Sequence, residues 1–185
     1  MKGKFVMIVG PSAAGKTELV RALLEQLPDS ARLVTTTTRQ RRAGETDEYF
    51  FISREEFEQG IKEDDFLEYS EVYGNLYGPS KSVLNSFLDK HKYVFGIIDV
   101  QGAKKLRESL PDAMTVFIHP GSLEDLRGRM RQVREGTPED ELQKRLEIAA
   151  HEISLAPSFD HIVENKEGFL DEAVKEVVGI VTKVE

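Results

Sequence analysis

The fold is decided by a stretch near the start of the chain, Phe5-Val6-Met7-Ile8-Val9-Gly10-Pro11-Ser12-Ala13-Ala14-Gly15-Lys16-Thr17. An apolar run ends at Gly10 and a leucine-rich helical pattern follows Thr17, so the stretch predicts a strand, a loop and a helix. The loop has the spacing G-x-x-x-x-G-K-T, in which glycine lets backbone N–H groups turn inward around a phosphate. The helix N-terminus adds partial positive charge. We therefore predict a nucleotide phosphate site, with Lys16 at the terminal phosphates and the Thr17 hydroxyl on Mg²⁺.

The composition narrows the class of protein. A chain of 185 residues suits one domain with a sizeable core. The net charge of −8 makes general nucleic-acid binding a poor expectation. The chain has no cysteine, which excludes disulfides, thiolate zinc sites and cysteine nucleophiles. It also has no apolar run near the ~20 residues of a membrane span and no signal-peptide core. We expect no membrane partner and a cytoplasmic location.

Apolar strand patterns alternate with helical patterns along the chain. Strands are predicted at residues 5–10, 33–36, 93–99, 114–118 and 161–163, and helices at 15–27, 122–155 and 169–183. This alternation predicts an α/β fold, with a parallel sheet covered by helices on both faces. The carboxyl ends of the strands should meet at the phosphate loop.

Two regions depart from the simple alternation. Residues 33–80 form a small β-rich lobe in this prediction, and Ser53 with Glu56 has the pattern of a capping box. Residues 122–155 are helical and highly charged, with a break near 136–138.

Asp99 is the second candidate for phosphate chemistry, because it follows the apolar run 93–98. An acid at a strand end beside a phosphate loop commonly supports the Mg²⁺ shell. The alternative is a carboxylate that caps the helix beginning near Gly102.

Arginines gather in two places. Arg39, Arg41 and Arg42 lie in an irregular stretch, where their guanidinium groups match phosphate oxygens or simply face water. A second set lies on the charged helices: Arg127, Arg129, Arg131, Arg134 and Arg145. These residues fit either a lid that brings positive charge to a moving phosphoryl group or a solvated surface.

Taken in order, these motifs resemble those of the guanylate kinases, P-loop enzymes that phosphorylate GMP with ATP. The resemblance runs nearly end to end. It rests on the phosphate loop and on Thr37-Thr38-Arg39, Arg42-Ala43-Gly44-Glu45, Tyr49-Phe50-Phe51, Phe66-Leu67-Glu68-Tyr69, Gly74-Asn75-Leu76-Tyr77-Gly78, Asp99-Val100-Gln101-Gly102-Ala103 and Arg145-Leu146.

The resemblance implies a division of the chain and a set of substrates. The core would comprise residues 1–33, 81–121 and 151–185, the GMP-binding lobe residues 34–80, and the lid residues 122–150. The substrates would be GMP (or dGMP) and ATP, with Mg²⁺, in a monomer or a homodimer.

The resemblance also implies roles for single residues. ATP and Mg²⁺ would be held by Gly10, Pro11, Ser12, Ala13, Ala14, Gly15, Lys16, Thr17 and Asn165, the last near the adenine, with Thr17 and Asp99 as metal ligands. GMP would be held by Thr35, Arg39, Arg42, Tyr49, Glu68, Tyr77, Ser80 and Asp99, with Glu68 accepting the guanine N1 and N2 protons. The catalytic set would be Lys16, Arg39, Asp99, Arg134 and Arg145.

Three positions depart from the family pattern. Ile97 stands where an acid is usual, and Ala13 where the phosphate loop usually has glycine. Pro79 replaces a hydroxyl residue that touches the base, and Ser80 is the expected substitute.

These departures keep two other functions open. One is a kinase of the same fold with another phosphorylated acceptor. The other is a non-catalytic guanylate-kinase-like binding module, although such modules tend to have lost the phosphate-loop lysine, which is present here as Lys16.

Overall fold

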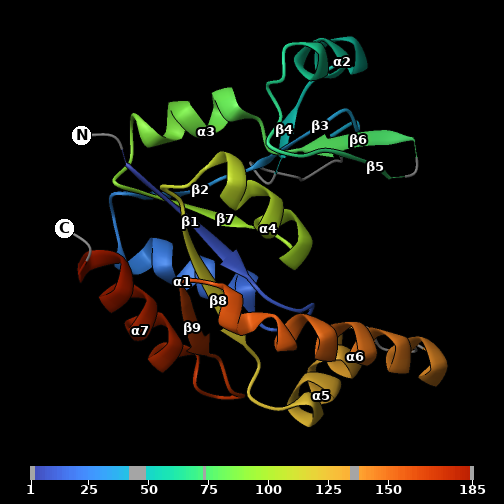
Figure 1. The fold of residues 1–185 in the computed structure, drawn as a ribbon, viewed down its shortest axis with the longest axis vertical. Coiled ribbons are helices and arrows are strands. Elements are labelled where there is room, and N and C mark those ends of the chain that lie inside the picture. Colours follow the sequence, from blue (N-terminus) through green and yellow to red (C-terminus); the bar gives the residue numbers. More distant parts are fainter. Residues whose placement is uncertain (1–2, 42–48, 73, 134–137, 184–185) are drawn as a thin grey trace.

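A parallel five-stranded sheet forms the centre of the computed structural model (Figure 1), which describes residues 3–41, 49–72, 74–133 and 138–183. Across the sheet the strands are ordered β2 (Ser30–Arg32), β7 (Tyr93–Ile97), β1 (Lys4–Val9), β8 (Met114–His119) and β9 (His161–Glu164). The helices that cover it are α1 (Lys16–Gln26), α3 (Lys81–Leu88), α4 (Val100–Ser109) and α7 (Leu170–Lys183). The predicted α/β class with a parallel sheet is confirmed.

The alternation of side chains along β1 explains why both faces of the sheet are covered. Val6 and Ile8 lie in one core with the apolar residues of α1 and α7. Met7 and Val9 point the other way and pack in a second core with α3 and α4. Because both faces of the strand are buried, its sequence is a continuous apolar run and not an alternating one.

A second, four-stranded sheet lies at one end of the molecule. Its strands are ordered β4 (Tyr49–Phe51), β3 (Thr35–Thr37), β6 (Asn75–Gly78) and β5 (Ser70–Val72), and helix α2 (Arg54–Lys62) packs on it. Phe57 of α2 stacks on Phe66 with 3.9 Å between ring centroids and forms a small core with Leu76. The predicted strand at 33–36 is wrong in its bounds, because β2 ends in the first sheet at Arg32 and β3 begins in the second at Thr35. The chain passes between the two sheets there.

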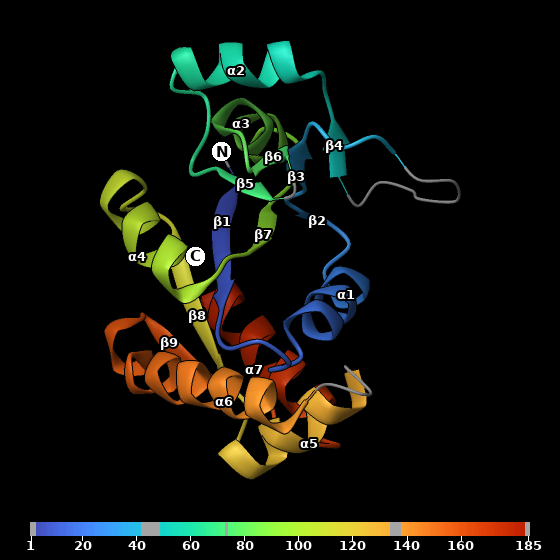
Figure 2. The same cartoon turned by 90° about the vertical axis from the view of Figure 1, so that its right-hand side faces the viewer.

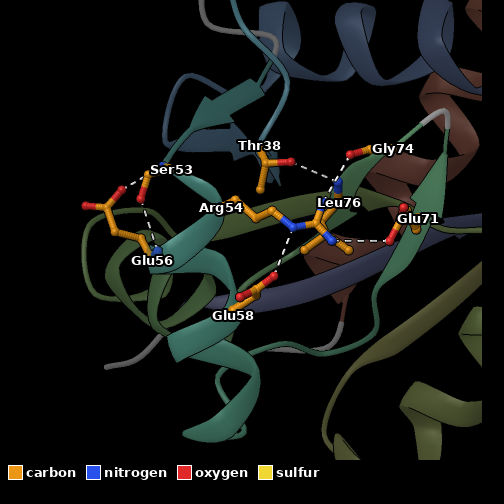
Figure 3. Close-up of polar contacts among 8 residues, drawn as sticks. All are labelled: Thr38, Ser53, Arg54, Glu56, Glu58, Glu71, Gly74 and Leu76. Carbon is orange, nitrogen blue, oxygen red and sulfur yellow. Dashed lines mark hydrogen bonds and ion pairs between the residues drawn. The ribbon is translucent and has the colours of Figure 1, made fainter.

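The start of α2 is fixed by side-chain contacts (Figure 3). The Ser53 hydroxyl accepts from the Glu56 N–H at 3.1 Å, and Glu56 accepts in turn from the Ser53 N–H at 2.7 Å. The predicted capping box is therefore confirmed. Arg54 then joins the helix to the second sheet through Glu71, at 3.5 Å, and the carbonyl of Gly74, at 3.1 Å.

Helices α5 (Leu123–Val133) and α6 (Glu139–Ser154) form a pair at the opposite end of the molecule from the second sheet (Figure 2). They share a separate core of Leu126, Met130, Leu142, Leu146 and Ala149. The carboxyl end of β1 is directed toward this pair in both views. A short 3-10 turn, η1 (Ala156–Ser158), leads from α6 to β9.

Asp160 fixes the start of β9 beside β8. Its carboxylate accepts from the Thr115 N–H at 2.8 Å, from the Thr115 hydroxyl at 2.6 Å and from Arg107 at 2.9 Å. Burial acts to raise the pKa of Asp160, but the hydrogen bonds from Thr115 and the charge of Arg107 outweigh it and hold that pKa below its usual 3.8. The anionic form therefore stabilises the fold.

We expect Asp160→Asn to lower the free energy of unfolding at pH 7 by about 1–3 kcal/mol, the range for hydrogen bonds to a charged group. When the pKa of a carboxyl group is lower in the folded state than in the unfolded state, its charge stabilises the fold at pH values above the unfolded-state pKa. This stabilisation is lost as the pH falls through the folded-state pKa. Urea unfolding from pH 7 to pH 3 should show the gap to wild type closing in acid, with exposed Asp112→Asn as the control. A gap that stays constant with pH would exclude the carboxylate charge as its cause.

Among the described residues, none of the helices combines the length and the apolar character needed to cross a bilayer.

Candidate active site

The phosphate loop joins β1 to α1, as the spacing of its glycines predicts. Gly15 is the N-cap of α1 with φ 82°, in the left-handed region that favours glycine. A side chain there would also meet the amide of Asn165. There are therefore two reasons for glycine at position 15: its positive φ and the close approach of Asn165.

Ala13 lies in the left-handed region as well, with φ 64°. This is the condition under which alanine in place of glycine is costly, by roughly 1–2 kcal/mol. Its methyl group, however, packs against the shared core of α5 and α6. The substitution thus adds strain to the loop and, at the same time, an apolar contact between the loop and the helical pair.

The strain and the packing of Ala13 predict different effects of two substitutions on stability. Ala13→Gly should change the free energy of unfolding by no more than about 0.5 kcal/mol, because relief of strain is offset by lost packing and a freer unfolded chain. Ala13→Val should destabilise by about 2 kcal/mol, since a β-branched residue is strongly disfavoured at positive φ. Urea unfolding of both variants tests this expectation. Equal stability of the valine and alanine forms would contradict it.

Lys16 folds back over the phosphate loop. Its ammonium donates to the carbonyls of Gly10, at 2.6 Å, and Pro11, at 2.7 Å. Burial lowers the pKa of Lys16 to about 8, and the carboxylates of Glu152 and Asp99 oppose that shift only partly. A buried ammonium of this kind gains when phosphate oxygens replace the carbonyls.

Glu152 was not among the predicted site residues. It lies on α6, is half-buried, and has a raised pKa because burial outweighs the attraction of Lys16. Nothing local distinguishes it from the other glutamates of the charged helix. Only the packing of α6 near the loop brings it to Lys16.

Asp99 is the N-cap of α4, and its Oδ1 accepts from the Gly102 N–H at 2.8 Å. The capping role left open by the sequence is thus confirmed. Asp99 also lines the cavity described below and acts electrostatically on Lys16.

The donor set near the loop suits Mg²⁺ held mainly by a nucleotide. It offers the Thr17 hydroxyl, exposed on the first turn of α1, and the Asp99 carboxylate. The described part of the chain contains no cluster of three or more histidine or acidic side chains able to hold a metal by themselves. Hard oxygen ligands in small number fit Mg²⁺, which usually takes the rest of its shell from phosphates and water.

A cavity of about 230 Å³ opens between the two sheets. Its walls include Thr35, Glu68, Tyr77, Pro79, Ile97 and Asp99. The structure therefore brings together four of the predicted substrate residues from four separate segments. It also places two of the three departures, Pro79 and Ile97, in the wall of the same cavity.

Glu68 is one of two acidic residues that line this cavity, with Asp99. Burial raises its pKa, the nearby carboxylate of Asp99 raises it further, and Lys105 opposes the shift. Its carboxylate lies against Gly102, at the first turn of α4. A carboxylate in such a position can accept two adjacent N–H groups of a planar ring.

Arg39 and two tyrosines meet on the second sheet. The Arg39 guanidinium stacks over the rings of Tyr49, at 5.3 Å, and Phe51, at 5.4 Å. Tyr77 meets Tyr49 edge to face at 6.1 Å between centroids. One cation and two phenols are thus gathered as a phosphate anchor requires, while Arg42, the fourth predicted member, lies outside the described residues.

Ser80, the expected substitute for the hydroxyl lost at Pro79, lies at the start of a helix. Its hydroxyl is buried, accepts from the Val83 N–H at 3.1 Å and donates to Asp65 at 2.8 Å. Ser80 is the N-cap of α3, so its side chain serves the helix end and does not line the cavity. The contact of Ser80 with the base stays a prediction, and of these two residues Pro79 is the one that lines the cavity.

The arginines of the helical pair divide into three cases. Arg145 donates from Nε and Nη2 to Glu141, at 3.0 and 2.6 Å, along the surface of α6. Arg129 reaches the other way and donates to the carbonyl of Asn165 at 2.7 Å. Arg134 lies outside the described residues.

Asn165 holds the phosphate loop in place. Its buried side-chain amide donates to the carbonyl of Ala14 at 2.9 Å, and the side chain covers Gly15. The predicted contact with adenine remains a prediction, whereas the loop contact was not foreseen. Since Arg129 binds the Asn165 carbonyl, the helical pair, β9 and the loop are joined through one residue.

A phosphate loop between the first strand and helix of a parallel sheet, facing an acceptor cavity, defines a P-loop kinase. The profile of the guanylate kinase family matches residues 2–184, and the chain belongs to that family.

Individual relatives agree with this assignment. A guanylate kinase of Clostridium perfringens (strain SM101 / Type A) is 42% identical over 181 residues, covering 97% of this chain and 82% of its own. One from Rubrobacter xylanophilus is 38% identical over 99% of this chain and 95% of its own.

Solved structures show the same fold. The crystal structure of guanylate kinase from Anaplasma phagocytophilum superposes with a TM-score of 0.69 at 29% identity, over 98% of this chain and 86% of that one. Shikimate kinase from Bacteroides thetaiotaomicron, at 13% identity and a TM-score of 0.54 over 97% and 98% of the two chains, shares the fold.

Proposed function

We propose that the protein transfers the terminal phosphoryl group of ATP to GMP or dGMP, forming ADP and GDP or dGDP. The relatives named guanylate kinase support this activity over nearly the whole chain. The observation that carries it is Glu68, a half-buried carboxylate in the wall of a cavity that Asp99 also lines. Guanine presents adjacent N1 and N2 protons to such a group, whereas adenine offers no matching pair.

The two ends of the molecule would have separate tasks. Residues 34–80 would bind GMP, residues 122–150 would form a lid over ATP, and residues 1–33, 81–121 and 151–185 would form the core. The separate small cores of the second sheet and of the α5–α6 pair support this division, because parts with their own cores can move as bodies.

On the donor side, residues 10–17 would surround the phosphates of ATP. Lys16, whose ammonium donates to the carbonyls of Gly10 and Pro11 at the same loop, would donate to the phosphate oxygens. Thr17 and Asp99 would hold Mg²⁺, which supplies charge neutralisation at the phosphates.

On the acceptor side, Arg39, Tyr49 and Tyr77 would bind the phosphate of GMP, together with Arg42. Thr35 and Glu68 would hold the base. Phosphoryl transfer needs the two anions in line and neutralised, with no covalent intermediate.

Arg134 and Arg145 would meet the transferring group from the lid. Arg145 already forms a charge pair with Glu141 on the surface of α6, at 2.6 Å. Delivery to a phosphate therefore requires that exposed pair to open, which is inexpensive because exposed pairs contribute about 0–1 kcal/mol.

The test is ADP production from ATP and Mg²⁺ with GMP, dGMP, IMP, AMP, CMP and UMP, each against a blank without acceptor. Selective turnover of GMP and dGMP supports the proposal and shows that Pro79 and Ile97 are tolerated in the cavity wall. If only another acceptor were phosphorylated, the protein would be a kinase for that acceptor and not for GMP. A chain that binds nucleotide without turnover would be a binding module.

A further inference from the structure

Gly102 occupies the contact between α4 and the carboxylate of Glu68. A Cβ atom added at Gly102 would lie 2.5 and 2.6 Å from the two carboxylate oxygens of Glu68, and 2.8 Å from their carbon. Cβ atoms of real side chains essentially never come within 3.0 Å of another heavy atom. The Glu68 carboxylate therefore lies directly against the Cα atom of Gly102, and in this arrangement only glycine fits at position 102.

This contact is not a requirement of the helix itself. Gly102 lies within the first turn of α4, where alanine is the better helix former. The three heavy atoms nearest to the added Cβ all belong to the Glu68 carboxyl group, the far end of a flexible side chain. A methyl group at position 102 would therefore displace Glu68 while leaving the backbone of α4 in place.

Gly102 also fixes the second carboxylate of the cavity. Its N–H donates to Oδ1 of Asp99 at 2.8 Å. The two like charges are close enough for Asp99 to act on Glu68, so neither can drift toward the other without cost. One residue thus holds Asp99 by its N–H and makes room for Glu68 by lacking a side chain.

From this geometry we propose that Gly102 is a positioning residue for acceptor selection: it sets where the Glu68 carboxylate stands and hence how well guanine is distinguished from other bases. This inference rests on the proposed GMP kinase activity. Moving the nearer oxygen from 2.5 Å to 3.4 Å, where ordinary contacts begin, takes about 0.9 Å, which exceeds the ~0.5 Å tolerance of a binding constellation.

The first experiment compares the steady-state kinetics of wild type and Gly102→Ala with GMP, IMP and AMP. In the variant, KM for GMP rises at least tenfold and the preference for GMP over IMP, which lacks the N2 amine, falls at least fivefold. KM for ATP changes less than twofold, and the melting temperature does not fall. The matched control is Gly179→Ala on α7, where an added Cβ meets nothing within 4 Å.

A second comparison separates positioning from general damage. Glu68→Asp withdraws the carboxylate by one carbon and makes room for a methyl group at position 102. Glu68→Asp should therefore lower kcat/KM for GMP much less when it is combined with Gly102→Ala than when it is made in the wild type. The effects of the two substitutions would then be non-additive.

The outcomes test the role of Gly102 separately from the proposed GMP kinase activity. A wild-type protein that does not turn over GMP overturns the proposed function and this inference with it. A wild type active on GMP, together with an unchanged KM for GMP in Gly102→Ala or with strictly additive effects, overturns the inference alone.

Discussion

Glu68→Gln lowers kcat/KM for GMP by about 10³-fold and abolishes the preference for GMP over IMP. The amide keeps one acceptor oxygen but replaces the other by an NH₂ group. One of the two hydrogen bonds to guanine is therefore lost, a donor faces a donor there, and the remaining bond no longer has a charged acceptor. A buried site that leaves such groups unpaired discriminates by several kcal/mol, at about 1.4 kcal/mol per factor of ten. Initial rates with GMP, IMP and AMP under saturating ATP measure the effect.

The fold should survive this change. The pKa of Glu68 is raised by burial and by Asp99, so its charge lowers stability at neutral pH, and a neutral side chain should leave the free energy of unfolding equal or higher. Glu71→Gln is the matched control, because Glu71 lies three residues after Glu68 in the sequence, is exposed, and pairs with Arg54 (Figure 3). If kcat/KM of Glu68→Gln for GMP stayed within threefold of wild type, Glu68 would not be a residue of the base site.

Lys16→Met lowers kcat by about 10²–10³-fold, the usual loss when one preorganised charge at the transition state is removed. KM for GMP should stay within threefold, because Lys16 lies on the donor side of the site. Stopped-flow or coupled assays of ADP release at saturating substrates measure the rate, and calorimetry measures the affinity for ATP.

The structure of the Lys16 variant should be intact and no less stable. Burial lowers the pKa of the ammonium to about 8, well below its usual 10.5, so the folded state holds the charged form at a cost. Lys175→Met, on the exposed side of α7, is the control for loss of one positive charge. A Lys16 variant that retains more than a third of the wild-type rate would contradict the role of the phosphate loop.

The strands that were predicted correctly are those in which the local pattern and the packing agree. β1, β7 and β8 are continuous apolar runs, and burial on both faces produces such runs directly. The passage from β2 to β3 was misplaced because its polar threonines carry no signal of the change of sheet. That change depends on partners such as Gly78 and Tyr77, about forty residues away along the chain.

The site shows the same division between local and long-range information. The phosphate loop and the strand-end acid Asp99 are encoded in short spacings, and the structure places them together. The capping role of Ser80 at α3 was not predicted, because adjacent residues of an extended segment point to opposite sides and the sequence does not show which side faces the helix end. Glu152 and the loop contact of Asn165 depend on packing between distant helices and strands, for which no local pattern exists.

The hydrogen bond from Asn165 to Ala14 spans 151 positions of the sequence. A ribosome makes the loop well before Asn165, so the loop lacks this hydrogen bond while the 151 positions between them are being made. Bringing together the ends of so long a segment loses conformational entropy, and this loss is offset only when the sheet is complete. We therefore expect ATP affinity to be acquired late in folding, and tight nucleotide binding to report that β9 has joined the sheet.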